Sequence, residues 1–270
     1  MLRSLYSGVS GLKNHQIRMD VIGNNISNVN TSGFKSSRVI FSDIYSQTLR
    51  PASAGTATTG GTNPVQVGLG VTIAAIDVMH TRTGAQYTGA PLDVSIEGDG
   101  FFVVNDGYNN FFTRTGSFKT DDNNFLVTPS GMRVQSLATP PATGTADVQI
   151  PAGYFDVSID KTGAIVGIDS ATNTKQTIGH ICLATFNNQN ALEKVGESLY
   201  RESANSGTPN YENPGTAGSA YLNPGALEMS NVDLAQEFTD MIITQRGFQA
   251  NSRIITTSDQ LLEELVNLKR

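Results

Sequence analysis

The chain has 270 residues and a formal net charge of −6 at pH 7, with 38% apolar and 16% charged residues. This length can hold one large domain or two small ones around a hydrophobic core. The basic residues form no cluster of the kind that binds nucleic acid, and no apolar run approaches the length of a membrane span. We therefore expect neither a nucleic-acid partner nor insertion into a membrane.

Residues 2–29 predict an amphipathic helix. Their apolar residues alternate in steps of three and four, with Gln16 and Gly23 at the skipped positions, which is typical of a coiled-coil seam. The seam residues are Leu2, Leu5, Val9, Leu12, Met19 and Ile26. The pattern ends at a cluster of turn-forming residues at 30–33. Residues 1–12 lack the continuous apolar core and cleavage site of a secretory signal, so we expect them to belong to the mature protein.

The middle of the chain predicts a β domain between two connections. The connections are an intermediate segment at 36–70, richest in small residues from Pro51 to Gly70, and a linker at 203–229. Residues 71–202 carry β-branched and aromatic runs separated by Gly, Asn and Asp turns, which favours a compact antiparallel domain. The clearest runs are Val71–Met79, Leu92–Ile96, Phe101–Val104, Phe111–Arg114, Phe125–Thr128, Tyr154–Ile159 and Ile178–Phe186.

The C-terminal segment at 230–270 predicts a second long helix with the same alternation. Its seam residues are Leu234, Phe238, Met241, Phe248, Ile255, Leu262 and Val266. A helix from Asp233 to Leu268 is roughly 54 Å long at 1.5 Å per residue, so it needs a partner beyond a small core. The N-terminal helix at 1–35 is the obvious partner. The predicted fold is therefore α+β, with terminal helices paired as a coiled coil and a central, mostly antiparallel β domain.

Four asparagines lie within seven residues, from Asn24 to Asn30. Because Asn is a poor helix former, this density requires an explanation. One interpretation is a fraying helix end followed by a turn. The other is a helix whose Asn side chains hydrogen-bond to neighbouring chains in a packed assembly. Composition alone favours the first.

The same stretch, Asn24-Asn25-Ile26-Ser27-Asn28-Val29-Asn30-Thr31 followed by Gly33-Phe34-Lys35, resembles the signature of the flagellar rod and hook protein family. Gly23 and Ser27 stand where alanine is common in that signature. Segments at 92–104, 112–118, 199–203, 227–234 and 245–252 also resemble the family, in the right order. The terminal segments resemble the short hook proteins of Gram-positive bacteria, and distal rod proteins share the short length.

This resemblance implies a structural subunit of the flagellar hook, a flexible tubular joint that transmits torque from rod to filament. The subunit would be exported without a cleaved signal peptide and lie outside the cell, in the hook–basal body. Implied partners are many copies of itself, rod and hook–filament junction proteins, the hook cap and the export apparatus. A distal rod protein and a secreted β-fold binding module remain as alternatives. The small residues at 51–70 would let outer contacts slide as a tube bends, which favours the hook.

The residues expected to carry assembly lie on both helices and in the signature. They are Leu5, Val9, Leu12, Met19, Asn24, Asn25, Ile26, Asn28, Phe34, Leu234, Phe238, Met241, Phe248, Ile255 and Leu262.

No residue pattern indicates an enzyme, a cofactor or a metal site. His15, His80 and His180 are scattered without metal-ligand spacing. Residues 98–100 begin a dinucleotide-binding fingerprint but lack its third glycine and the helix after it. The one cysteine, Cys182, forms no intrachain disulfide, and its apolar neighbours favour a buried core residue over a reactive thiol.

Overall fold

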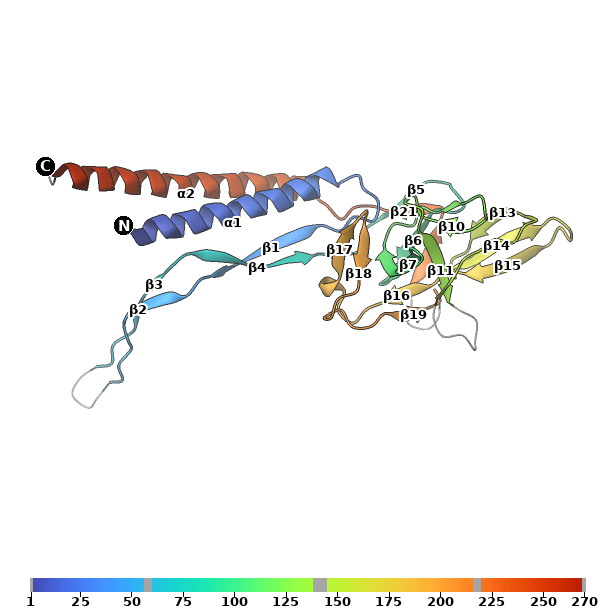
Figure 1. Cartoon of the computed structure of the whole chain (residues 1–270), viewed down its shortest axis with the longest axis horizontal. Coiled ribbons are helices and arrows are strands. Elements are labelled where there is room, and N and C mark those ends of the chain that lie inside the picture. The colour runs from blue at the N-terminus through green and yellow to red at the C-terminus, as the bar shows by residue number, and fades with distance from the viewer. Residues whose placement is uncertain (1, 56–59, 138–144, 216–219, 269–270) are drawn as a thin grey trace. The chain divides into compact units, whose positions relative to one another are not determined.

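The computed structural model of the chain describes residues 2–55, 60–137, 145–215 and 220–268. The chain divides into two compact units. We call Met1–Ser27, Ser37–Val78 and Val232–Arg270 the helical unit, and Asn28–Ser36 with Met79–Asn231 the β unit. Figure 1 labels the elements of both. The expected α+β class is confirmed, with a helix near each end and antiparallel strands between them.

The helical unit contains two helices and four strands. These are α1 (Leu2–Ser27), β1 (Ser37–Asp43), β2 (Ser46–Arg50), β3 (Val65–Gly68), β4 (Val71–Val78) and α2 (Leu234–Leu268). The helices lie side by side and run in opposite directions (Figure 1). Gly8 near the start of α1 faces Ile255, well along α2, whereas Asn25 near the end of α1 bonds Glu237 near the start of α2. Helix α2 begins after Asp233, whose Oδ1 accepts the Ala235 N–H at 2.9 Å as a helix cap. Strand β1 pairs with β4 and β2 pairs with β3, both antiparallel.

The segment at 36–70 differs from the expected linker. It holds β1, β2 and β3, and the run expected to open the β domain is β4 of the helical unit. Exposed and half-buried residues alternate along β1, as in a strand with one covered face. That face lies against α1, where the His15 ring packs on Phe41 with centroids 5.8 Å apart. Asn14 Nδ2 also donates to the Val71 carbonyl of the paired strand β4 at 2.5 Å. Strand pairing therefore orders residues whose composition alone predicts flexibility, although 56–59 lie outside the described residues.

The β unit consists of short strands and one 3₁₀ turn. They are β5 (Ala85–Tyr87), β6 (Val94–Glu97), β7 (Phe101–Asn105), β8 (Asn110–Thr113), β9 (Lys119–Thr120), β10 (Leu126–Val127), β11 (Arg133–Leu137), β12 (Thr145–Asp147), β13 (Tyr154–Ile159), β14 (Ala164–Asp169), β15 (Lys175–His180), β16 (Leu183–Thr185), η1 (Gln189–Ala191), β17 (Glu193–Gly196), β18 (Leu199–Arg201), β19 (Asn210–Glu212), β20 (Tyr221–Pro224) and β21 (Ala226–Glu228).

The strands of the β unit form one large sheet and three small ones. The large sheet has ten strands, with the path β17-β18-β8-β7-β11-β10-β9 and with β12, β16 and β19 at its sides. The small sheets are β13-β14-β15, β20-β6 and β21-β5. Strands β19, β20 and β21 lie within the linker expected at 203–229, of which 216–219 are outside the described residues. That segment is built into the β unit, because each of its strands pairs with an earlier one.

The hydrophobic core belongs to the β unit. It gathers Val94, Phe102, Leu126, Ile165 and Ile181, each with no exposed surface, and ten further buried residues. Fully burying such side chains stabilises a fold by roughly 1.5–3 kcal/mol each. Cys182 is buried beside this core, and burial raises the pKa of its thiol to about 12. Over the residues that the structure describes, no helix is both long and apolar enough to cross a membrane.

Candidate assembly surfaces

The contact between α1 and α2 is made largely by small and polar residues, although Gly8 also faces Ile255, whose Cγ1 would lie 3.3 Å from an added Cβ. A Cβ added at Gly11 would lie 2.8 Å from Nδ2 of Asn251, and one added at Gly247 would lie 2.7 Å from Cε1 of His15. On α2, Thr244 has no exposed surface and Ser258 is 7% exposed. Glycine at positions 11 and 247 lets the backbones of α1 and α2 approach closely. The helices therefore meet along a seam of mostly small and polar side chains, which we call the polar seam.

Ionic and amide contacts continue the polar seam toward the end of α1. Arg18 Nη2 lies 3.1 Å from Asp240 Oδ1, and Asn25 Nδ2 donates to Glu237 Oε1 at 2.9 Å. Burial raises the pKa of Glu237, and the hydrogen bond from Asn25 opposes that shift. The His15 ring also packs edge-on against a ring of β1, with centroids 5.8 Å apart, and burial lowers its pKa.

The apolar residues predicted to form the assembly seam lie beside the polar seam. On α1, at 100° per residue, they lie about a quarter turn from the contact with α2. Leu5, Leu12, Met19 and Ile26 are half-buried, whereas Val9 is 52% exposed. On α2, the half-buried members are Met241, Phe248, Ile255 and Leu262, and the exposed members are Leu234 and Phe238.

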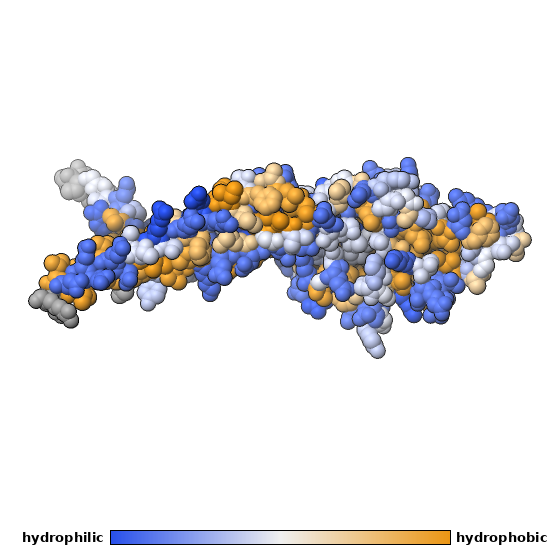
Figure 2. Space-filling view, turned by 90° about the horizontal axis from the view of Figure 1, so that it is seen from above, coloured by the Kyte–Doolittle hydropathy of each residue, from blue (hydrophilic) through white to orange (hydrophobic). Residues whose placement is uncertain are grey.

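Further large apolar side chains of α2 are exposed, although the sequence analysis did not single them out. They are Ile242, Ile243, Ile254, Leu261, Leu265 and Leu268. Figure 2 shows hydrophobic surface on the helical unit as well as on the β unit. An exposed apolar surface of this extent is typical of a protein interaction site.

The signature asparagines have different surroundings. Asn25 is 2% exposed and bonds both backbone groups of Ser37, donating to its carbonyl at 2.9 Å and accepting its N–H at 3.0 Å. It therefore fixes the first residue of β1 to α1. Asn24, one position earlier, is exposed. Asn28 lies in the β unit, where its carbonyl and Oδ1 accept hydrogen bonds from Thr31 and close a turn. Within one copy, Asn25 therefore joins α1 to β1 through buried hydrogen bonds, and Asn28 closes a turn.

The end of the signature is embedded in the β unit. Gly33 has φ +69°, and a Cβ there would lie 2.8 Å from the Thr115 nitrogen, so glycine is required by both conformation and space. Phe34 is half-buried, and the Lys194 ammonium lies 4.8 Å from its ring centroid. The same ammonium donates to the Lys35 carbonyl at 2.8 Å. This segment is held by side chains from distant parts of the sequence.

Lys35 belongs to a buried ionic cluster that the sequence analysis did not predict. Its Nζ lies 2.5 Å from Glu228 Oε1 and donates to the Thr81 carbonyl at 2.7 Å. Arg114 Nη1 lies 3.5 Å from Glu228 Oε2 and donates to the Gly98 carbonyl at 3.0 Å. The Lys35 and Arg114 side chains have no exposed surface, and that of Glu228 is 2% exposed. Burial lowers the pKa of both cations, and the Glu228 carboxylate opposes the shift.

Asn231 is a second residue that the sequence analysis missed. Its Oδ1 accepts the Ser36 N–H at 2.7 Å, and its Nδ2 donates to the Met79 carbonyl at 2.7 Å and to Thr81 Oγ1 at 2.9 Å. Ser36, Met79 and Asn231 are terminal residues of the two β-unit segments, at three of the points where the chain crosses between the units. One amide therefore ties these three segments together. The available signal was an Asn two residues before the predicted start of the C-terminal helix at Asp233.

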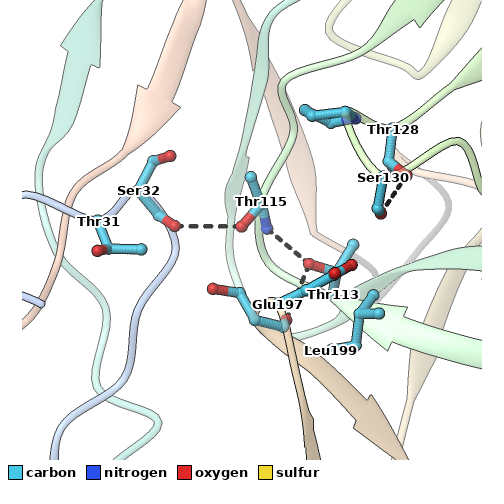
Figure 3. A pocket seen from close by; sticks show the side chains of 10 residues that line it. Thr31, Ser32, Thr113, Thr115, Thr128, Ser130, Glu197 and Leu199 are labelled. Carbon is cyan, nitrogen blue, oxygen red and sulfur yellow. Dashed lines mark hydrogen bonds between the residues drawn. The ribbon is translucent and has the colours of Figure 1, made fainter. Parts of the chain in front are cut away.

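A hydroxyl-rich cavity of about 410 Å³ adjoins the signature turn (Figure 3). Thr115 Oγ1 donates to the Ser32 carbonyl at 3.1 Å, and Thr113 Oγ1 donates to the Ser198 carbonyl at 3.1 Å. Glu197 and Ser198 both have positive φ, 51° and 59°, as the two-residue turn between β17 and β18 requires. The cavity offers hydrogen-bonding groups and one carboxylate. Among the described residues, no group of His, Cys, Asp and Glu could hold a metal ion.

The chain matches family descriptions along most of its length. Residues 5–35 match "Flagella basal body rod protein", residues 95–167 match "Flagellar hook protein FlgE/F/G D1 domain", and residues 223–268 match "Flagellar basal body rod FlgEFG protein C-terminal". The chain is 50% identical to the flagellar basal-body rod protein FlgG of Bacillus subtilis, with all of both chains covered. It is 39% identical to FlgG and 32% identical to the flagellar hook protein FlgE of Borreliella burgdorferi, again with full coverage of each.

Proposed function

The chain belongs to the family of flagellar rod and hook proteins, and from this we propose that copies of it polymerise into the axial tube of the flagellum. The observation that carries the proposal is the set of exposed apolar residues on α2, among them Phe238 at 50% and Ile242 at 59%. A single copy leaves this surface in water. A neighbouring copy would bury it, with roughly 1.5–3 kcal/mol for each side chain fully covered.

The predicted apolar seams would pair in a coiled-coil manner in this assembly. Within one copy the helices meet along the polar seam, so the three-and-four stripes beside it are available for other helices. Leu12 on α1 and Phe248 on α2 are half-buried members that another helix would cover fully. Asn24, which is exposed, would face a neighbouring chain.

The rod is the part of the tube that the comparisons favour. Two relatives named rod proteins align with this chain over 271 and 278 positions, whereas two relatives named hook proteins need 442 and 464 positions. The prediction of a bendable hook rested on the small residues at 51–70, where Val65–Gly68 is a paired strand and 56–59 lie outside the described residues. That segment does not by itself favour the hook over the rod. The hook remains the second candidate, because those hook relatives still align with the entire chain.

In either part, the partners would be other axial subunits. Adjoining rod and hook–filament junction proteins, the hook cap and the export apparatus fit a subunit that is exported without cleavage and assembled outside the cell. The role is structural, without catalysis. A secreted β-fold binding module would leave the apolar surface of α2 unexplained.

The test compares two substitutions in the same turn of α2. Phe238→Glu places a charge on the apolar surface, where burial without a partner is strongly unfavourable. Thr239→Glu adds the same charge at an adjacent exposed polar position. We expect Phe238→Glu to abolish sedimentable polymer while circular dichroism of the monomer is unchanged, and Thr239→Glu to polymerise. Normal polymer from Phe238→Glu would contradict the proposal.

A deletion strain separates the two parts of the tube. Electron microscopy of basal bodies should show a truncated rod if this chain is a rod subunit. A complete rod without a hook would instead assign the chain to the hook.

A further inference from the structure

The large sheet of the β unit carries a polar groove of about 660 Å³. Strand register places its lining on one face, since Asn110 pairs with Asn105, Asn105 with Arg133, and Gln135 with Asp147. Directly paired residues, and residues two apart along a strand, point to the same side of a sheet. A row of amide, guanidinium and carboxylate groups therefore crosses β8, β7, β11 and β12. The volume lies within the range of small-molecule sites.

Hydrogen bonds hold these groups in place before any ligand arrives. Asn105 Nδ2 donates to Asn110 Oδ1 at 2.6 Å, and Gln135 Nε2 donates to Asp147 Oδ1 at 2.6 Å. Gln135 is 2% exposed, so its amide is fixed by packing as well. Asn110 Nδ2 also donates to the Tyr211 hydroxyl at 3.4 Å, and Gln135 Nε2 also donates to the Arg133 carbonyl at 3.4 Å. The remaining capacity of these amides therefore lies mainly in their acceptor oxygens, and the guanidinium groups supply donors. The groove therefore presents several oriented groups of both kinds.

The charges that line the groove are balanced, with Arg133 and Arg201 against Asp147 and Glu202. Arg133 lies 2.8 Å from Asp147, and Arg201 lies 2.8 Å from Glu193, a carboxylate outside the lining. An anionic ligand needs cations that are not already neutralised, so phosphate compounds fit poorly. A neutral ligand rich in hydroxyl groups can both donate to and accept from this row. Tyr108, 93% exposed at the edge of the groove, offers a ring face for the apolar side of such a ligand.

We propose that this groove binds a neutral oligosaccharide, with the row around Asn110 recognising hydroxyl groups and Tyr108 stacking on one sugar ring. This binding is separate from polymerisation, because the groove lies entirely in the β unit and uses none of the residues of α1 or α2. The same chain can therefore contact a glycan through one unit and other copies of itself through the other.

The test is a titration of the full chain, kept monomeric, with chitotetraose and with maltotetraose, followed by nuclear magnetic resonance. We expect saturable shifts in groove residues with one of these sugars. Asn110→Ala and Tyr108→Ala should each weaken binding by about tenfold, the loss of one or two hydrogen bonds or one stacking contact. Tyr87→Ala is the matched control, since Tyr87 is 80% exposed and lies outside the groove.

Three outcomes would overturn the proposal. They are the absence of saturable shifts with either sugar up to about 10 mM, equal affinity in Tyr108→Ala and Tyr87→Ala, and shifts of the same residues with inorganic phosphate alone. Tyr108 is exposed, so its variant keeps the fold and the test stays decisive even if Asn110→Ala destabilises the sheet.

Discussion

Lys35 offers the sharpest test of how the signature segment is held in the β unit. Replacing it with methionine keeps most of its length but removes the ammonium group. The Glu228 carboxylate would then stay buried at 2% exposure, with only Arg114 at 3.5 Å as an ionic partner. Removing one partner of a buried ion pair typically costs about 3–5 kcal/mol. For a unit of this size, that loss lowers the melting temperature by about 6–20 °C.

Glu228→Gln should destabilise more than Lys35→Met. It leaves two buried cations, Lys35 and Arg114, without an anion between them. The matched control is Arg82→Met, which breaks an ion pair with Asp99 whose side chains are 63% and 59% exposed. Exposed pairs contribute about 0–1 kcal/mol. The order of destabilisation should therefore be Glu228→Gln, then Lys35→Met, then Arg82→Met.

The assay is urea denaturation of monomeric protein, followed by tyrosine fluorescence because the chain has no tryptophan. The free energy of unfolding is compared among the three variants and the parent chain. If Lys35→Met costs no more than Arg82→Met, the buried cluster does not hold the signature, and the reasoning from burial fails.

Three further substitutions test other contacts. Burial, with Arg114, Lys35 and Lys194 nearby, lowers the pKa of His80 to about 4, whereas the unfolded chain takes up this proton near pH 6.5. The free energy of unfolding should therefore fall by about 3 kcal/mol as the pH is lowered from 6.5 to 4. In His80→Asn, the urea midpoint should depend less steeply on pH over this range. Asn25→Ala should lower the free energy of unfolding by about 1–3 kcal/mol, measured by thermal melting of the helical circular dichroism signal, whereas Asn24→Ala at an exposed position should leave it almost unchanged. Gly247→Leu should lower the free energy of unfolding by about 1–3 kcal/mol in the same melt. Ala250→Leu, at an exposed position, is the control, and an equal loss in both variants would refute close packing at the polar seam.

The terminal helices and the β character of the middle could be predicted from the sequence, because periodicity reports directly on helices and strands. Both helices and strands such as β4 and β13 lie where their patterns placed them. The pairing of β1 with β4 could not be predicted in the same way. Strands 28 or more residues apart join through backbone hydrogen bonds, and the small residues between them indicate only a connection.

The polar seam was missed for a different reason. An apolar heptad predicts that helices meet on apolar residues, whereas these meet where Gly11 and Gly247 allow close approach. The spacing of three between small residues, from Gly8 to Gly11 and from Thr244 to Gly247, was the available signal. Glu228 was also visible as a lone charge between Leu227 and Met229, whereas Lys35 stands between Phe34 and two serines. Which charge meets which across nearly two hundred residues depends on the tertiary fold, and the sequence pattern does not contain it.

The distribution of side chains on α2 links the fold to assembly. Residues on the polar seam are mostly small or polar, so the contact with α1 brings the backbones together and contributes less hydrophobic stabilisation than an apolar seam would. The large apolar side chains, such as Phe238 and Leu265, lie outside that contact and contribute only when something covers them. A neighbouring copy that binds the folded chain but not the unfolded chain stabilises the folded state by mass action. The helical unit should therefore be more stable in the polymer than in the monomer. For this reason Phe238→Glu should act on assembly alone, whereas Gly247→Leu should act on the unit itself.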